Sequence, residues 1–267
     1  SVIMILYALI SGESVGALFA GGVLPGLLLL VLVSAYILIR CFFQPHLGPP
    51  LPPEDRVGWS QKFLALRAVL LPILIVVMVL GSIILGITTP TEAAAMGVAG
   101  AIISAIIYRQ FSWQLLKEAG IRTLRLTGMI MWILFGAYCF TAAYHGMGAH
   151  HLIENLMSNV PGGPWGAIIF MQVIIFALAM VLDPAGIMMI CVPIFLPIIK
   201  AHGFDPLWFG IIFVINMEIG YMTPPFGFNL FYLKGIVPPG INMADIYRSV
   251  IPYALVELAG MILIMIF

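Results

Sequence analysis

The stretch EIGYMTPPFGFNLF, residues 218–231, contains two adjacent prolines inside a strongly apolar segment. A proline has no N–H to donate to the carbonyl four residues earlier, and its ring clashes with that carbonyl. Pro224 is therefore predicted to leave the carbonyl of Gly220 without its helical partner. Pro225 is predicted to do the same to the carbonyl of Tyr221. The stretch thus predicts a helix that is broken into two shorter pieces.

A break of this kind presents polar backbone groups that can bind a small ligand. The bare carbonyls, together with the hydroxyl of Thr223, suit a small cation. Pro225 suits the first position of a new half-helix. The amides of Phe226, Gly227 and Phe228 would then face the break and attract a carboxylate. Secondary transporters build midplane sites from discontinuous helices in this way. A plain proline kink is the alternative, and adjacent prolines between flanking glycines favour the binding site over it.

The composition of the chain is that of a membrane protein. Of its 267 residues, 63% are hydrophobic and only 8% are charged, whereas a soluble domain is about one quarter charged. A helix that spans the bilayer needs about 20 apolar residues. Such a helix fits into each of the long segments without Asp, Glu, Lys or Arg, which are 14–39, 68–91, 126–153 and 155–182. The formal net charge of zero gives no reason to expect a nucleic-acid partner, and the three cysteines have no metal-binding spacing.

Six regular spans and their orientation follow from the charge pattern. The predicted spans are 20–39, 67–86, 91–108, 123–144, 165–182 and 249–267. Lys and Arg cluster in the loops 40–66 and 109–122, which two spans separate, so the positive-inside rule makes both loops cytoplasmic. Within the second loop, residues 111–120 form a short amphipathic segment that we expect along the membrane interface. The linker 145–164 has no Lys or Arg, and we expect it on the periplasmic side.

A second irregular stretch precedes the break. LDPAGIMMICVPIFLPIIKAHGFDP, residues 182–206, carries four prolines, and its apolar part, 184–199, is short for a regular span. Non-helical backbone at membrane depth is tolerated only inside protein or beside a water-filled cavity. We therefore predict a re-entrant hairpin over 182–201. Asp183 directly precedes Pro184, so it is expected to cap a helix at least as readily as to bind an ion.

Three stretches together resemble one family of membrane proteins. The segments 182–206 and 218–231, with GITTPTEAAAMG at 86–97, are similar to signatures of the large membrane subunit of the tripartite ATP-independent periplasmic (TRAP) transporters. The opening segment 1–26 resembles the part of that subunit that follows its first-half Pro-Pro-Ser motif. The resemblance implies an all-α, polytopic helical membrane protein with a re-entrant hairpin and a proline-broken helix. It also implies the second half of an inverted-repeat, elevator-type transporter.

The resemblance further implies a function. Such a subunit is the permease of a sodium-coupled importer of organic acids in the bacterial inner membrane, with Na⁺ as the coupling ion and no other cofactor. Its expected partners are a small membrane subunit, a periplasmic substrate-binding protein and the lipid bilayer. We expect no enzymatic activity, because the sequence shows no paired nucleophile and base. Residues 126–267 would form the transport region, with its hairpin at 182–201 and its broken helix at 207–236, and residues 1–125 would form scaffold and connecting helices.

In the family's second repeat, a hairpin and a broken helix form one sodium site. Carried over to this sequence, the residues expected around the cation are Asp183, Gly186, Gly220, Tyr221, Thr223 and Pro224. Thr223 is the expected side-chain ligand. The residues expected on the substrate side are Phe226, Gly227 and Asn229. The residues expected to form a structural motif are Thr89, Pro90, Thr91 and Glu92. Glu92 is expected to satisfy the start of its helix or to tie two helices together.

One hairpin with one broken helix is half of a paired inverted repeat. Its first-half counterpart would precede Ser1, so a fragment or a shortened relative is expected. The alternative function is therefore a truncated, transporter-derived accessory subunit with a structural role in a larger membrane complex. Glu218 is expected to pair either with backbone or with a cation, and Glu257 to mark a helix–helix contact. The three histidines of the linker 145–164 have no standard zinc spacing, and we expect no metal there.

Overall fold

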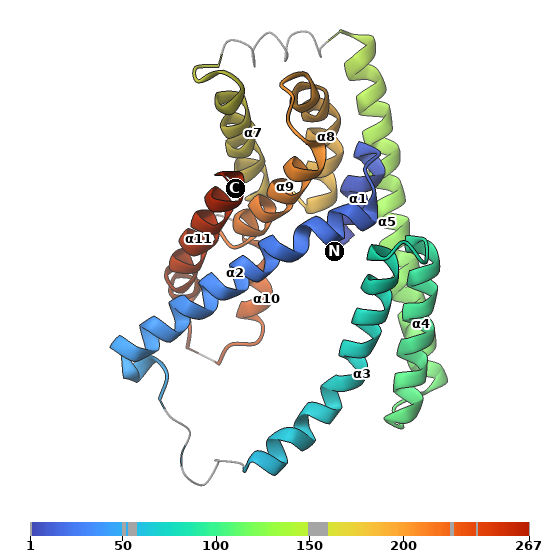
Figure 1. Ribbon diagram of the computed structural model, residues 1–267, viewed down its shortest axis with the longest axis vertical. Coiled ribbons are helices and arrows are strands. Elements are labelled where there is room, and N and C mark those ends of the chain that lie inside the picture. Colours follow the sequence, from blue (N-terminus) through green and yellow to red (C-terminus); the bar gives the residue numbers. More distant parts are fainter. Residues whose placement is uncertain are drawn as a thin grey trace. The chain divides into compact units, whose positions relative to one another are not determined.

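The chain is helical throughout the part that the structure describes. The computed structural model describes residues 2–49, 52, 58–148, 160–224, 227–238 and 240–266. No strand occurs among them, and five helices are long and apolar enough to cross a membrane: α2 (Val15–Phe43), α4 (Pro90–Ile107), α5 (Trp113–Gly146), α8 (Pro184–Ala201) and α11 (Met243–Ile266). The remaining described elements are α1 (Val2–Ser11), η1 (Pro45–Leu47), α3 (Trp59–Ile84), α7 (Gly163–Ala179), α9 (Pro206–Tyr221) and α10 (Phe228–Lys234) (Figure 1). The predicted class, a polytopic α-helical membrane protein, is confirmed.

The contacts divide the chain into two compact units. The smaller unit is Ile37–Thr127, and the larger unit joins Ser1–Tyr36 to Gly128–Phe267. The N-terminal helices therefore pack with the C-terminal part of the chain, although they are distant from it in sequence. The functional division that we predicted between residues 125 and 126 stays a prediction.

Helices α3 and α4 of the smaller unit pack closely because glycines line their contact. A Cβ on Gly97 would lie 3.3 Å from Val79, and one on Gly100 would lie 3.0 Å from Ile75. Small residues allow two helix backbones to approach each other in a membrane. The turn between the two helices contains Gly86, whose φ is +69°. The two helices correspond to the predicted pair of spans.

Helix α9 is the centre of the larger unit. It packs against α1, α7, α8, α10 and α11, and its residues Phe213 and Met217 have no exposed surface. A helix that is apolar on all sides is suited to such a position. Tyr7 of α1 is also fully buried, and its hydroxyl donates a hydrogen bond to the carbonyl of Pro206 over 2.6 Å. The Tyr7 ring occupies the space that a side chain at Gly210 would need.

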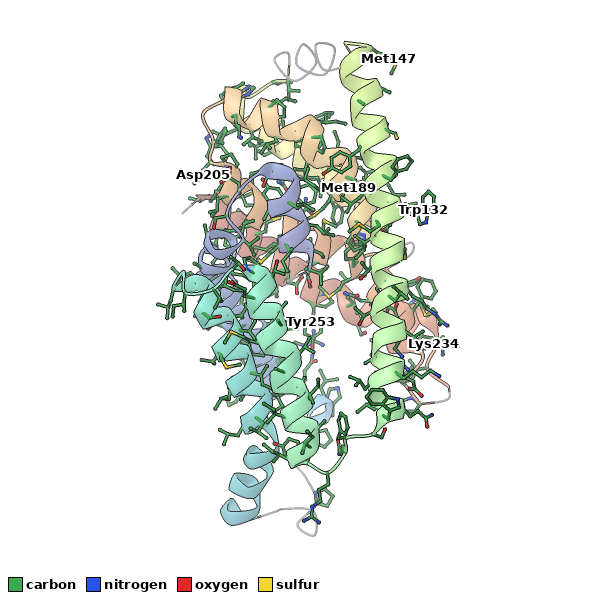
Figure 2. The ribbon with its side chains drawn as sticks, turned by 90° about the vertical axis from the view of Figure 1, so that its right-hand side faces the viewer. Trp132, Met147, Met189, Asp205, Lys234 and Tyr253 are labelled. Carbon is green, nitrogen blue, oxygen red and sulfur yellow. The ribbon has the colours of Figure 1, made fainter. Side chains whose placement is uncertain are left out.

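The side chains of the larger unit separate into an apolar interior and exposed faces. In Figure 2, Met189 of α8 points into the unit and Trp132 of α5 points outward, which agrees with their exposed fractions of 4% and 76%. Asp205, before the start of α9, and Lys234, at the end of α10, lie on opposite sides of the unit in the same view. The segment from α9 to α10 therefore crosses the unit with a charged residue at each end.

The prediction of a re-entrant hairpin over 182–201 is wrong, because α8 runs through this segment as one continuous helix. Pro184 is at its first turn, where no N–H is needed. Pro193 and Pro197 lie inside the helix, and each removes one hydrogen bond. A turn at either proline would leave several backbone groups without partners in apolar surroundings, which costs more. The chain turns instead at Gly203, whose φ is +77°, so that α8 and α9 together form a helical hairpin.

The prediction of a loop over 109–122 is also wrong, because the chain is helical from Trp113 onward. The hydroxyl of Ser112 accepts a hydrogen bond from the amide three residues later, over 3.0 Å, which suits the start of a helix. Gly120 alone costs a helix only about 1 kcal/mol and does not end it. The predicted interfacial segment and the span after it are therefore one helix, α5.

Candidate functional site at the broken helix

The predicted broken helix is present as two separate helices, α9 and α10. Helix α9 ends at Tyr221 and α10 begins at Phe228. Gly227 directly precedes α10 and has a φ of +51°, in the left-handed region that glycine adopts without a steric penalty. The second helix therefore starts three residues later than we predicted from Pro225. Pro225 and Phe226 lie outside the described residues.

The carbonyl of Gly220 was predicted to be bare, and this is wrong. It accepts a hydrogen bond from the amide of Thr223 over 3.0 Å. The amide of Met222 likewise donates to the carbonyl of Ile219 over 3.2 Å. The last turn of α9 is therefore tightened into bonds between residues three apart, a common way to satisfy the end of a helix. A carbonyl oxygen has two lone pairs, so that of Gly220 keeps one for a further partner.

The hydroxyl of Thr223 is oriented by the same turn. Its Oγ1 donates a hydrogen bond to the carbonyl of Ile219 over 2.7 Å, and the residue is half-buried. Because the hydroxyl proton points at that carbonyl, the lone pairs of Oγ1 remain available to accept a hydrogen bond or to coordinate a cation. Small hard cations prefer oxygen ligands of this kind.

Asp183 caps helix α8. Its Oδ2 accepts hydrogen bonds from the amides of Ala185, over 3.1 Å, and Gly186, over 3.2 Å. A Cβ on Gly186 would lie only 3.0 Å from Asp183 Oδ1, so glycine leaves room for the carboxylate. The capping interpretation is confirmed. A role of Asp183 or Gly186 as a cation ligand stays a prediction.

Three helix ends meet at the break. Gly220 lies so close to Ala179, the last residue of α7, that a side chain at Gly220 would overlap it. Asp183, at the start of α8, follows Ala179 by only four residues, so it lies near the same end of α9. Candidate residues from two separate stretches of sequence therefore do lie in one region of the larger unit.

The candidates on the substrate side differ in exposure. Gly227 is buried at the start of α10, whereas Asn229, in its first turn, is exposed. Phe226 lies outside the described residues. Helix α10 has only seven residues, so its dipole is weaker than the half-helix interpretation assumed.

An apolar cavity of about 670 Å³ adjoins the break. One wall is a face of α7 that includes Trp165 and Phe176, and the other is a face of α11 that includes Leu255 and Leu258. Thr223 and its neighbours at the break also line it. Small-molecule sites commonly have this size, mostly apolar walls and a few polar groups.

Two buried amide side chains in the cavity wall were not predicted. Asn216 Nδ2 donates hydrogen bonds to the backbone carbonyl and to Oε1 of Gln172, each over 2.7 Å. Gln172 is 5% exposed and Asn216 is 2% exposed. Gln172 Nε2 is buried and has no hydrogen-bond partner in the structure. The available signal was one amide residue in each of two apolar helices.

The structural motif in the smaller unit is a capping box. The hydroxyl of Thr89 accepts a hydrogen bond from the amide of Glu92 over 3.3 Å, and Glu92 Oε2 accepts one from the amide of Thr89 over 2.8 Å. Pro90 follows as the first residue of α4, with Thr91 next. The prediction that Glu92 satisfies the start of its helix is confirmed.

The remaining polar residues add little to the site. Glu218 is exposed, whereas Glu257 Oε2 is buried and has no hydrogen-bond partner. Glu257 lies in α11, which packs against α9. Among the described residues, no three His, Cys, Asp or Glu side chains are grouped so as to hold a metal. The linker histidines His145 (its side chain), His150 and His151 lie outside that part.

Fold and site together define a class of protein. Five of the described helices are long and apolar enough to cross a bilayer, and the central helix α9 is separated by a break from α10. This is a polytopic α-helical membrane protein with a discontinuous helix, a feature at which secondary transporters build binding sites.

The chain belongs to the large permease family of TRAP transporters. The family profile described as "Tripartite ATP-independent periplasmic transporter, DctM component" matches residues 1–267. The family consists of transporter permeases of the inner membrane rather than enzymes.

Three relatives illustrate the similarity. The C4-dicarboxylate TRAP transporter large permease protein DctM of Pseudomonas aeruginosa is 32% identical over 99% of this chain and 60% of its own length. The ectoine TRAP transporter large permease protein TeaC of Halomonas elongata is 32% identical over 86% of this chain and 53% of its own. The 2,3-diketo-L-gulonate TRAP transporter large permease protein YiaN of Escherichia coli is 28% identical over 96% and 59%. The chain thus spans somewhat more than half the length of these relatives.

Proposed function

We propose that this chain acts in a permease that imports small organic acids and couples their uptake to sodium ions. The observation that carries the proposal is the break between α9 and α10, where the carbonyl of Gly220 and the hydroxyl of Thr223 lie at the end of α9, beside the end of α7. Family membership supports transport, and the break supports a cation site within it. A discontinuous helix exposes backbone oxygens without the cost of unfolding a whole span.

The proposed cation site is built from the end of α9. Thr223 Oγ1 contributes lone pairs, because its proton is held by the carbonyl of Ile219. The carbonyl of Gly220 contributes its second lone pair. Several oxygens are needed to replace the water shell of an ion, and this turn offers those of Gly220 and Thr223 from nearby positions.

The proposed substrates are carboxylic acids. The names of the relatives mention C4-dicarboxylates, ectoine and 2,3-diketo-L-gulonate, and each of these molecules bears a carboxylate. A cation at Thr223 would offset the negative charge of a carboxylate nearby. Gly227 and Asn229, with Phe226, are proposed to face the substrate, since they follow the cation site along the chain.

The proposed partners are a small membrane subunit and a periplasmic substrate-binding protein. The proposed orientation places the Lys- and Arg-containing segments 40–66 and 109–122, which include the ends of helices, on the cytoplasmic side and the linker 145–164 on the periplasmic side. Most of α3 and all of α4 lie between those two segments, as this orientation requires. Aromatic rings gather near the linker: Trp165 and Trp208 lie 6.0 Å apart between ring centroids, as in an interfacial aromatic belt.

The test is sodium-dependent uptake by the full-length permease with its two partners in liposomes. Removing the ligand and one proline together, with Thr223→Ala and Pro224→Ala, is expected to abolish the stimulation of uptake by a sodium gradient. If uptake keeps its sodium dependence in this double variant, the proposed cation site is wrong.

The matched control is Thr123→Ala with Pro72→Ala in the smaller unit. Thr123 Oγ1 also donates to the carbonyl four residues earlier, over 2.9 Å, and Pro72 is a proline of helix α3. The same two types of side chain are thus removed in the other compact unit. We expect this variant to keep its sodium dependence.

A further inference from the structure

A second cavity lies within the smaller unit, between helices α4 and α5. It is a groove of about 640 Å³. The turn at residues 109–112 joins the two helices and closes one end of the groove. A Cβ on Gly120 would meet no atom within 4 Å, so the groove is open beside this glycine. The described residues that line the groove are apolar except for Thr123 and Thr127.

The groove suits an acyl chain in both chemistry and length. Its walls are mostly hydrocarbon, as a lipid tail requires. From Leu115 to Thr127 the wall formed by α5 is about 18 Å long, at a rise of 1.5 Å per residue. An acyl chain that reaches the middle of a bilayer crosses about 15 Å, half of its hydrocarbon core. One chain can therefore lie along the groove.

Basic residues border the groove on both sides of α5. Residues seven apart lie two turns apart on nearly the same side of a helix. Arg122 follows Leu115 at this spacing, and Lys117 precedes Leu124 at the same spacing. Leu115 and Leu124 form the two edges of the lining face. Arg122 and Lys117 are exposed, and their long stems can lie along apolar surface while their charges stay in a polar environment.

The charge of this helical hairpin is strongly one-sided. Between residues 98 and 127 the chain has four Lys or Arg residues and a single acid, Glu118. Arg109 is one of the four, and it lies in the turn at the closed end of the groove. An apolar groove with a basic end matches a molecule that has a long hydrocarbon chain and an anionic head.

We infer that this groove binds an anionic phospholipid, with one acyl chain between α4 and α5 and the phosphate at Arg109 and Lys117. Basic pockets between transmembrane helices bind the head groups of anionic lipids in this way. A zwitterionic lipid would offer the same chain but no net negative charge to these residues. Neither the groove nor its basic border includes a residue of the break, so the outcome of the test is independent of the proposed cation site.

The experiment measures lipid binding to the purified full-length permease in detergent by native mass spectrometry. The probes are dioleoyl phosphatidylglycerol and dioleoyl phosphatidylcholine, which have the same acyl chains. Gly120→Trp fills the groove. Its matched control is Gly128→Trp, which places the same side chain at an exposed glycine of α5 that also has open space but does not line the groove.

A second pair of variants tests the charge. Arg122→Gln removes a charge at the edge of the groove. Arg125→Gln removes the same charge from the side of α5 that faces away from the lining residues, since it lies three residues further along the helix. Both changes keep a long polar side chain.

Phosphatidylglycerol is expected to bind at least about tenfold more tightly than phosphatidylcholine, because each basic residue near an anionic lipid strengthens binding by about fivefold. Gly120→Trp is expected to abolish this binding and Gly128→Trp to retain it. Arg122→Gln should weaken it by about fivefold and Arg125→Gln by less than about twofold.

Equal affinity for the two lipids overturns the inference, and so does unchanged binding of phosphatidylglycerol in Gly120→Trp. If Gly120→Trp keeps the lipid but no longer co-purifies with the small membrane subunit, a protein helix occupies the groove and the inference is wrong. Should Gly120→Trp fail to fold, the two arginine variants decide, because equal affinity in Arg122→Gln and Arg125→Gln also overturns the inference.

Discussion

The chain uses the dipeptide Thr-Pro twice, with opposite results. At Thr89 the hydroxyl accepts a hydrogen bond from the amide three residues later, and the helix α4 begins. At Thr223 the hydroxyl donates backward to the carbonyl of Ile219, and the helix α9 has just ended. The Thr89 hydroxyl already accepts a hydrogen bond within a closed capping box, whereas the Thr223 hydroxyl keeps its lone pairs available.

The residues that follow each dipeptide explain the difference. The first motif reads Thr-Pro-Thr-Glu, and Glu92 closes the box by accepting from the amide of Thr89. The second reads Thr-Pro-Pro-Phe, with no side chain that could do so at Phe226. A capping box needs Glu or Gln at its third position. One side chain three residues downstream thus decides whether the same dipeptide starts a helix or leaves an open turn.

The largest effect is expected when the second motif is converted into the first. Pro225→Thr with Phe226→Gln recreates the capping-box pattern without adding a charge. The Thr223 oxygen would then accept an amide hydrogen bond and be lost to the cation, so sodium-dependent uptake should fall by about tenfold or more, as expected when a charged partner loses a hydrogen-bonding oxygen. Uptake by the full-length transporter in liposomes checks this, with Glu92→Phe as the reverse change. If the converted protein keeps its sodium-dependent uptake, the proposed difference between the two motifs is wrong.

A second prediction concerns the close packing that holds the break in place. Gly220→Ala adds a methyl group where Ala179 already lies, and overpacking of this kind costs about 1–3 kcal/mol. The loss of stability is measured by denaturation of the purified protein in detergent. Ala179→Gly in the same chain should recover most of it, because the two methyl groups compete for one space. If Ala179→Gly gives no recovery, the contact between α7 and α9 at the break is not as described.

The helical class and the break could be predicted from sequence because both depend on local chemistry. Apolar segments of sufficient length predict spans, and two adjacent prolines remove two neighbouring hydrogen bonds. The error at 182–201 shows the limit of this argument. Pro193 and Pro197 are separated, so each removes one bond within an otherwise intact helix. The adjacency of prolines, more than their number, distinguishes the two segments.

Contacts between distant helices could not be predicted from a single sequence. The pair Gln172 and Asn216 is separated by 44 residues, and it forms because α7 packs on α9. The hydrogen bond between Tyr7 and Pro206 likewise joins residues that are 199 positions apart in the sequence. The bare carbonyl expected at Gly220 was wrong for a different reason, since a tightened last turn satisfied it locally. Packing and small backbone adjustments lie beyond what spacing in a sequence reveals.

A smaller effect is expected at the closed motif. Thr89→Ala removes the capping hydroxyl of α4 and should destabilise the protein by about 1 kcal/mol, within the range measured for helix caps. Thr89→Ser keeps the hydroxyl and should be nearly neutral. Thermal denaturation compares the two. Sodium affinity in the uptake assay should be the same in both, and a selective loss in Thr89→Ala would mean that the motif is more than structural.

The smallest effect is expected at Asp183, and it separates the two roles that remain for this residue. Asparagine caps helices about as well as aspartate, so Asp183→Asn should change the stability by less than about 0.5 kcal/mol. The amides of Ala185 and Gly186 would keep an acceptor oxygen, as they have now. If Asp183 only caps α8, the apparent affinity for sodium in the uptake assay should stay within about twofold, because the oxygens at Thr223 are untouched. A tenfold loss of sodium affinity at unchanged stability would instead make the carboxylate part of the cation site. The start of α8 and the turn at Thr223 would then together form one open site, in contrast to the closed capping box at Thr89.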